Sequence, residues 1–434
     1  MMIKSFNHIF YKQYLLYTMS YQLISLVFYN LILLFLLFVW IKTKGWQLNG
    51  TLYILFFLLF SGIISAFYWN VSNGTIRNYS NLTLIPFFYL IIGYLITLMP
   101  IVKYDITPRK ELSITNKQGV FLHYFTLFLI IISFEPFGEN LLHLPSVIAN
   151  SDYAAKMYDS RVEYLSFIGR KLNRISTSFE LIYPPLLFYF LQKKIISKKI
   201  VYGLIMVILS FWIHELGLGG RSKLVQNILY LVVCFFLMRP YINACITKKI
   251  ILYGSVVIGL GICMVLLISI SRFTSIEAEG SNIENIWIWL GLYAGEGVLN
   301  FNSLMWYVEK STGGDSTFIF LKDLLGLTKG SGVEDNWATV SKLGIPGNIF
   351  YTYIGSIFED FNKIGTLIFL LVFSTITIKL TKIKNGLITF PQIIILCLCA
   401  RVLVIPTFYT YTSLMAQTNL LCVLCFSMVI YLKK

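Results

Sequence analysis

Long apolar stretches recur along almost the whole chain and limit what it can fold into. A helix needs about 20 mostly apolar residues to cross a bilayer, and its backbone hydrogen bonds must be satisfied within the segment. We therefore expect an all-α fold, a polytopic integral membrane helical bundle of about 11 transmembrane helices, within a range of 10–12. The predicted spans are residues 21–41, 50–69, 82–101, 119–134, 176–191, 200–217, 222–238, 250–270, 360–378, 389–406 and 413–432.

The composition supports membrane insertion and excludes other classes of protein. Hydrophobic residues make up 57% of the chain and charged residues 13%, whereas a soluble domain carries about 25% charged residues. A water-soluble enzyme is therefore excluded, and so is a disordered chain. The net charge of +15 indicates membrane topology rather than a nucleic-acid partner, because Lys and Arg accumulate in cytoplasmic loops.

Basic residues occupy every second connection between the predicted spans. By the positive-inside rule this pattern places the N-terminus outside and the C-terminus in the cytoplasm. The six basic groups are Lys42 and Lys44; Lys103, Arg109, Lys110 and Lys117; Lys193, Lys194, Lys198 and Lys199; Arg239, Lys248 and Lys249; Lys379, Lys382 and Lys384; and Lys433 and Lys434.

Two outward-facing connections are long and hold most of the acidic residues. We treat residues 1–434 as a single membrane domain with a first large periplasmic or extracellular loop at 135–175 and a second at 271–347. Within the second loop, residues 286–308 are apolar but contain Glu296 and three glycines. We expect this segment to form an interfacial or re-entrant helix rather than a span.

Arginine is concentrated on the outer side. The six basic groups contain 16 Lys and two Arg, and the other seven arginines lie outside or near the outer end of a span. A guanidinium grips phosphate oxygens in pairs and tolerates partial desolvation. Arg221, Arg272 and Arg401 are therefore candidates for binding a lipid-linked pyrophosphate, while Arg77, Arg161, Arg170 and Arg174 fit ion pairs with loop carboxylates or contacts to headgroups.

Each of the three candidate arginines has its own context. Arg221 follows a glycine-rich turn, and Ser222 opens the next span, so that a helix N-terminus with free N–H groups lies beside the guanidinium. A plain tight turn would need the glycines but not the arginine. Arg272 begins the second loop, and Arg401 lies within an apolar segment, where a charge is usually functional or paired.

Acidic and imidazole groups lie near the same outer ends of spans. Glu180, His214 and Asp360 are the candidates for the base that takes a proton from a sugar hydroxyl. Each also fits a second role, as a structural partner of a nearby cation. No Asp-X-Asp, histidine cluster or cysteine spacing suggests a metal site, and we expect neither a metal nor a cofactor.

These residues together resemble a known family. The Gly-Gly-Arg-Ser turn at 219–222, Arg272 at the start of the large loop, and the segment GNIFYTYIGSIFEDFNKIG at 347–365 resemble the Wzy-type polymerases of O-antigen and capsular polysaccharide repeat units. The family usually has Asp, an aromatic residue and Gly in the late segment. Here Asp360 and Phe361 match, but Asn362 stands where Gly is usual.

The resemblance implies a function. It implies a membrane glycosyltransferase that moves a growing glycan from undecaprenyl pyrophosphate to the non-reducing end of a lipid-linked repeat unit, without metal, in polysaccharide biosynthesis. The enzyme would lie in the bacterial cytoplasmic (inner) membrane with its active site toward the periplasm or cell exterior. Its partners would be the undecaprenyl-pyrophosphate-linked oligosaccharide, membrane lipid, a flippase and a chain-length regulator, and no nucleic acid.

Other functions remain open at this point. An O-antigen ligase-type glycan transferase shares the lipid-pyrophosphate chemistry and a similar architecture. A lipid-linked oligosaccharide flippase would have short loops and a charged central cavity, whereas here the charge lies in two long loops. A polyprenyl-phosphate-sugar glycosyltransferase would have acidic residues in the first outer loop, and residues 70–81 contain none. His214 beside Glu215 is a weak sign of a membrane acyltransferase.

Overall fold

The fold is known from a computed structural model of the chain. It describes residues 2–72, 79, 81–108, 111–149, 153, 156–157, 164–193, 195–218, 220, 222–275, 282–327, 333–347, 349–405 and 412–433. Side chains are described for all of these except residues 2–20, 72, 267–275, 282–286 and 333–336.

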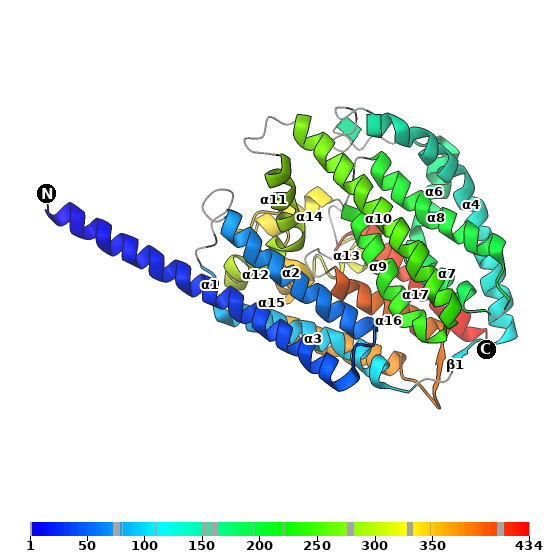
Figure 1. The fold of residues 1–434 in the computed structure, drawn as a ribbon. Helices are drawn as coiled ribbons and strands as arrows, with labels where there is room; N and C mark the ends of the chain where they lie inside the picture. The colour runs from blue at the N-terminus through cyan, green and yellow to red at the C-terminus, as the bar shows by residue number, and fades with distance from the viewer. Residues whose placement is uncertain are drawn as a thin grey trace.

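The described chain is mostly helical, as the apolar stretches predict (Figure 1). The helices are α1 (Met2–Lys44), α2 (Gly50–Ser72), α3 (Leu84–Ile106), α4 (Asn116–Ala149), α6 (Phe167–Ser178), α7 (Tyr183–Leu191), α8 (Lys198–Gly217), α9 (Ser222–Met238), α10 (Ala244–Ser275), α11 (Asn282–Ala294), α12 (Glu296–Ser303), α13 (Ile319–Leu324), α14 (Val333–Ser341), α15 (Thr352–Leu380), α16 (Phe390–Val404) and α17 (Leu414–Leu432). Short 3₁₀ turns are η1 (Glu180–Ile182), η2 (Arg239–Tyr241) and η3 (Met305–Tyr307), and two strands are β1 (Glu111–Ser113) and β2 (Leu387–Thr389).

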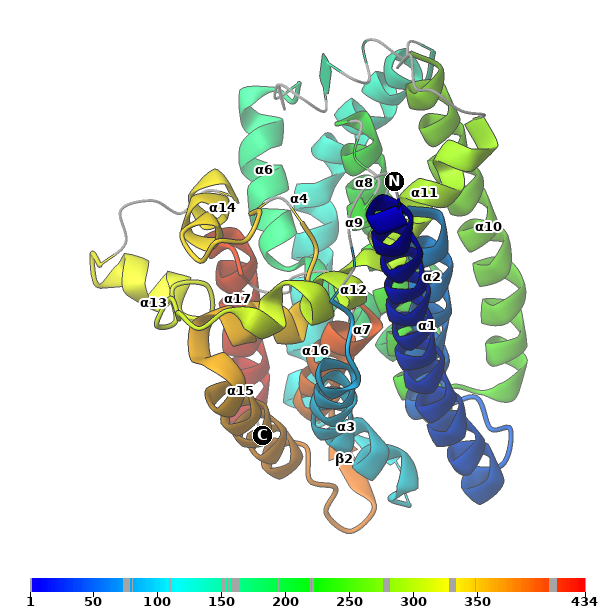
Figure 2. The ribbon, with the colours of Figure 1, turned by 90° about the vertical axis from the view of Figure 1, so that its left-hand side faces the viewer.

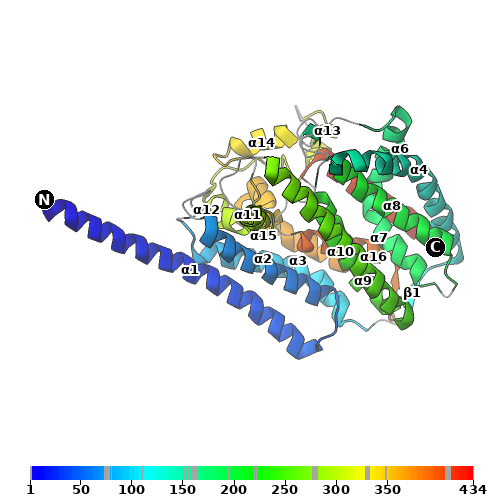
Figure 3. The ribbon, with the colours of Figure 1, turned by 45° about the horizontal axis from the view of Figure 1, so that its top comes forward.

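The predicted membrane-embedded helical class is confirmed. Among the described residues, nine helices are long and apolar enough to cross a membrane. Two further predicted spans are shorter apolar helices, at Glu180–Leu191 and Phe390–Val404. Both are shorter than the roughly 20 residues that a bilayer requires. The first span continues upstream as one helix, α1, whose N-terminal half extends away from the bundle (Figures 1 and 3).

The described parts of the basic connections gather at one end of the bundle, which we call the lysine-rich end (Figure 2): residues 45–49, 107–108, 111–115, 192–193, 195–197, 239–243 and 381–389, and Lys433. Strand β1 pairs in parallel with β2 and joins two of these connections. Arg239 Nη1 donates to the carbonyl of Leu48 over 2.8 Å, and Thr115 Oγ1 donates to the carbonyl of Lys433 over 3.2 Å. The all-α prediction did not include this small sheet. It forms where two connections meet below the bundle (Figure 2), and it pairs backbone groups that are not in helices.

The opposite end carries the two long connections, and both are largely helical where they are described. Helix α4 continues through residue 149 into the first connection, and α6 follows it. Helix α4 packs against both α8 and α6. The predicted interfacial segment 286–308 is divided into α11, α12 and η3. At the break, Ser61 Oγ donates to the carbonyl of Ala294 (2.6 Å) and Ser65 Oγ to that of Gly295 (2.9 Å). Helix α12 is buried throughout, so this segment enters the bundle.

Helix α15 is interrupted at Asn362, the position where the resembled family usually has Gly. Asn362 has φ 59° and ψ −171°, a conformation outside the helical region. The phenolic hydroxyl of Tyr89 donates to the freed carbonyl of Lys363 over 2.6 Å, and Thr366 Oγ1 donates to the carbonyl of Asn362 over 2.7 Å. The tight turn is therefore made without glycine, and the backbone at Asn362 is strained.

Replacing Asn362 with Gly is expected to stabilise the protein. Backbone strain of this kind costs about 1–3 kcal/mol, and the extra unfolded-state freedom of Gly takes back about 0.5–1 kcal/mol. The side-chain Oδ1 of Asn362 is buried without a hydrogen bond, so Gly sacrifices no hydrogen bond of that oxygen. Thermal unfolding in detergent should show a higher Tm for Asn362→Gly and a lower or unchanged Tm for Asn362→Ala, which keeps the strain. An equal Tm in all three proteins would contradict the strain.

Candidate functional site

Three polar residues form a stripe along α9. Lys223, Asn227 and Tyr230 are spaced at i, i+4 and i+7, so they lie on one face of the helix. Helix α9 contacts α7 and α16, and its first turn lies at the end of the bundle opposite the lysine-rich end. Polar side chains at this spacing within an apolar span are the sequence signal that identifies the site.

Lys223 connects two carboxylates that come from different elements. Its Nζ lies 2.9 Å from Glu215 Oε1 at the end of α8 and 3.8 Å from Glu180 Oε2 in η1. Asn227 Nδ2 donates to the other oxygen of Glu180 over 2.8 Å. Glu180 is nearly buried, at 9% exposed, while 34% of the Lys223 side chain is exposed. The protein therefore holds the ammonium between two carboxylates, while part of the Lys223 side chain remains exposed.

Arg401 brings a second cation to the same face of α9. Its Cζ lies 5.9 Å from the centroid of the Tyr230 ring, and the Tyr230 hydroxyl donates to the carbonyl of Leu181 over 2.8 Å. Arg401 is half-buried on α16, which packs against α3 and α9. The Arg401 charge and the Lys223 charge act on each other. Two cations and the two carboxylates thus balance in a partly desolvated setting.

His214 is held by amides on both sides of its ring. Its Nδ1 lies 3.1 Å from Asn140 Oδ1 and 3.0 Å from the Tyr164 hydroxyl. Tyr164 itself donates to Asn140 Oδ1 over 2.7 Å, and Asn173 Nδ2 lies 3.4 Å from His214 Nε2. This network fits a neutral imidazole whose Nδ1–H donates to Asn140 and whose Nε2 accepts from Asn173, a tautomer inferred from the partners. The network fixes the orientation of the His214 ring, and Glu215 is the next residue in the chain.

Asp360, another predicted base, joins the second long connection to α15. Asp360 accepts hydrogen bonds from the backbone N–H of Thr317 (2.6 Å) and of Ser316 (3.2 Å), and from Thr312 Oγ1. The neighbouring Glu359 accepts from the Tyr351 hydroxyl over 2.8 Å and from Ser316 Oγ. Both carboxyl groups are buried. We call this set the loop latch.

The predicted site residues therefore fall into separate places. Glu180, His214 and Arg401 lie around the first turns of α9, where Ser222 begins the helix. Among the described residues, no hydrogen bond or ion pair connects Asp360 with any of them, so the structure does not join this candidate base to these residues. Arg221 lies outside the described residues. Arg272 lies in α10, a helix beside α9 at the edge of the bundle (Figures 1 and 3), and its side chain is outside the description.

Several residues of the site are not predicted from the sequence. Glu215 enters the prediction only as the neighbour of His214, and Asn227, Asn140 and Tyr164 do not enter it. Lys223 and Asn227 have the stripe on α9 as a signal. Asn140 and Tyr164 have none, because they reach His214 only through the packing of elements that are distant in the sequence. We use the term cluster for the set Glu180, His214, Glu215, Lys223, Asn227 and Arg401.

We expect the second long connection to lose order locally when the Asp360 carboxylate of the loop latch is changed. Asp360→Asn puts an amide N–H₂ among donors and removes the charge that strengthens three hydrogen bonds, at a cost of about 2–3 kcal/mol. We expect limited proteolysis to cut the connection near residues 311–327 faster than in the parent protein. Glu309→Gln, an exposed carboxylate in the same connection, is the matched control and should be cut at the parent rate. Equal rates for both variants would show that Asp360 does not hold the loop.

Comparisons with known proteins leave the assignment to the site itself. Protein-family models, curated proteins and solved structures yield no match to this chain. The geometry of the cluster and the resemblance noted in the sequence are therefore the grounds for a functional proposal.

Proposed function

We propose that the chain is a membrane glycosyltransferase that polymerises lipid-linked oligosaccharide repeat units, with the carrier pyrophosphate bound at Lys223 and Arg401. The observation that carries the proposal is the convergence of these two cations with Glu180, Glu215 and His214, in the half of the bundle opposite the lysine-rich end. Cations at the lysine-rich end have an explanation in topology alone. Lys223 and Arg401 do not, and charges within apolar segments are usually functional.

The cluster offers both kinds of group that the transfer needs. As the bond between the anomeric carbon and the pyrophosphate oxygen breaks, negative charge grows on the leaving group. Lys223 and Arg401 stabilise that charge electrostatically, and Ser222 places the N-terminus of α9 beside them. The acceptor hydroxyl oxygen forms the new bond to the anomeric carbon, and its proton must pass to a base.

The base is best supplied by one of the carboxylates of the cluster. Glu215 and Glu180 both form ion pairs with Lys223. A pyrophosphate that binds the ammonium competes with them and leaves a carboxylate available to the acceptor hydroxyl. His214 lies next to Glu215, but both of its ring nitrogens have amide or hydroxyl partners. We assign it the role of positioning Glu215 and the end of α8.

Removing the Lys223 charge tests the proposal. Lys223→Met keeps the length and apolar stem of the side chain but cannot bind phosphate. In cells that lack the native copy, we expect Lys223→Met to abolish long glycan chains and to leave single repeat units on the carrier lipid, as resolved by gel electrophoresis. Lys379→Met, an exposed lysine at the other end of the bundle, is the control and should give normal chains.

The same cells distinguish polymerase from the alternatives. Single units on the outer face support polymerisation, units retained on the cytoplasmic face would assign the cluster to a flippase, and full-length polymer still attached to its carrier would assign it to a ligase. Normal chains in Lys223→Met, with the protein present at the parent level, would reject the assignment of pyrophosphate to this cluster.

A further inference from the structure

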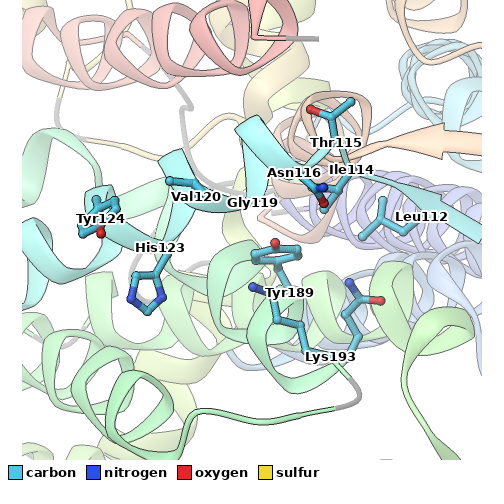
Figure 4. Close-up of a pocket in the computed structure, with 11 residues that line it drawn as sticks. Leu112, Ile114, Thr115, Asn116, Gly119, Val120, His123, Tyr124, Tyr189 and Lys193 are labelled. Atoms are coloured by element: carbon cyan, nitrogen blue, oxygen red, sulfur yellow. The ribbon is translucent and has the colours of Figure 1, made fainter.

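A cavity lies at the lysine-rich end, far along the bundle from the cluster. It has a volume of about 560 Å³ and opens between the first turns of α4 and the end of α7, beside β1 (Figure 4). Its lining includes polar side chains from both helices and from the residues next to them: Thr115, Asn116, His123, Tyr189, Gln192 and Lys193. None of these residues takes part in the proposed transfer.

Lys193 is the charged group of this cavity. Its Nζ lies 4.8 Å from the ring centroids of both Tyr189 and Phe190. Among the described residues, no carboxylate lies within ion-pair distance of it. Burial lowers the pKa of Lys193, because desolvation disfavours the charged ammonium. An anion that entered the cavity would offset the desolvation cost of the ammonium. The rings of Tyr189 and Phe190 hold the ammonium in position.

Two further lysines lie near residues that line the cavity. Thr115 Oγ1 donates to the carbonyl of Lys433, and the Lys433 ammonium lies 5.0 Å from the ring centroid of Phe121, one turn into α4. Lys117 is exposed in the first turn of α4. Gln192 and Asn116 add amide N–H donors to the lining. The ligand that this chemistry recognises is a phosphate group rather than a cation or a neutral molecule.

An apolar stripe leads from the cavity along α4. Val120, Tyr124, Phe128 and Ile131 are spaced by three or four residues and are 56%, 67%, 47% and 71% exposed. Val120 and Tyr124 line the cavity themselves. Because α4 is long and apolar enough to cross a membrane, this exposed stripe is suited to contact with acyl chains. The site thus combines a phosphate pocket with an apolar track that begins at its rim.

We propose that this cavity binds an anionic phospholipid of the adjoining leaflet, with its phosphate at Lys193 and an acyl chain along the α4 stripe. Basic pockets between membrane helices bind such headgroups in this way. A lysine that only contributes to the positive-inside pattern needs no cavity and no ring contacts, because a position near the surface is sufficient. Lys193 differs because it is half-buried against two rings and faces a cavity large enough for a headgroup.

Two substitutions test the site by separate routes. Lys193→Met removes the charge and keeps the stem. Gly119→Leu fills the cavity and keeps the charge: a Cβ at Gly119 meets only the Tyr189 hydroxyl, at 3.8 Å, so the added side chain has room. The full-length protein is placed in nanodiscs of phosphatidylcholine alone or with added phosphatidylglycerol, and the Tm and the retained lipids are measured by thermal unfolding and native mass spectrometry.

We expect phosphatidylglycerol to raise the Tm of the parent protein and to remain bound through purification. Both Lys193→Met and Gly119→Leu should weaken its binding roughly tenfold or more, the factor carried by one charge-assisted hydrogen bond. The control is Lys379→Met, which removes an exposed lysine at the same end and should bind phosphatidylglycerol as the parent does.

Three results would overturn the proposal. An equal loss of phosphatidylglycerol binding in Lys193→Met and Lys379→Met would show that this lipid acts through general surface charge. An equal rise in Tm with soluble glycerol phosphate would assign the cavity to a free phosphate and not to a lipid. Unchanged lipid retention in Gly119→Leu would place the lipid outside the cavity. Because Lys193 has no part in glycan transfer, each result is independent of the proposed enzymatic function.

Discussion

The structure depends on the rule that a polar group within an apolar bundle must find its partner in the protein. Water does not compete there, so each hydrogen bond or ion pair fixes the position of the elements that supply it. Glu180 and Glu215 come from different elements and are brought together by one lysine. Ser61 and Ser65 bind the backbone where α11 gives way to α12. The polar contacts therefore determine how the helices fit together, while apolar contacts supply most of the packing.

The two ends of the bundle use this rule differently. At the lysine-rich end, connections are joined by backbone pairs such as β1 with β2, and most of the described cations are exposed. At the opposite end, Lys223 lies beside two carboxylates and Arg401 lies against the Tyr230 ring, both within helices that are largely apolar. A charge held in that way keeps a high affinity for a second anion, because part of its desolvation cost is already met by the folded protein. This difference is why we place the transfer chemistry there.

The interruption of α15 joins the second long connection to the core. The loop latch at Glu359 and Asp360 lies directly before the strained residue Asn362, and the Tyr89 hydroxyl binds the carbonyl just after it. The short first half of α15 is thereby buried with α12, and the remaining part runs on toward the lysine-rich end. A carboxylate directly before a turn thus has a structural explanation here: it orders the loop above the bundle.

The apolar stretches by themselves determined that the chain is a helical membrane protein, because burial of backbone polar groups in lipid leaves few other solutions. They also located most of the long helices of the bundle. The alternation of basic groups along the chain predicted that the basic connections meet at one end. Only the tertiary structure decided that Glu180, Glu215 and Lys223 form one cluster, that Asn140 and Tyr164 hold His214, and that Asp360 serves the loop latch. Each of these depends on contacts between elements distant in sequence, and periodicity reports which face of a helix is apolar but not which helix that face meets.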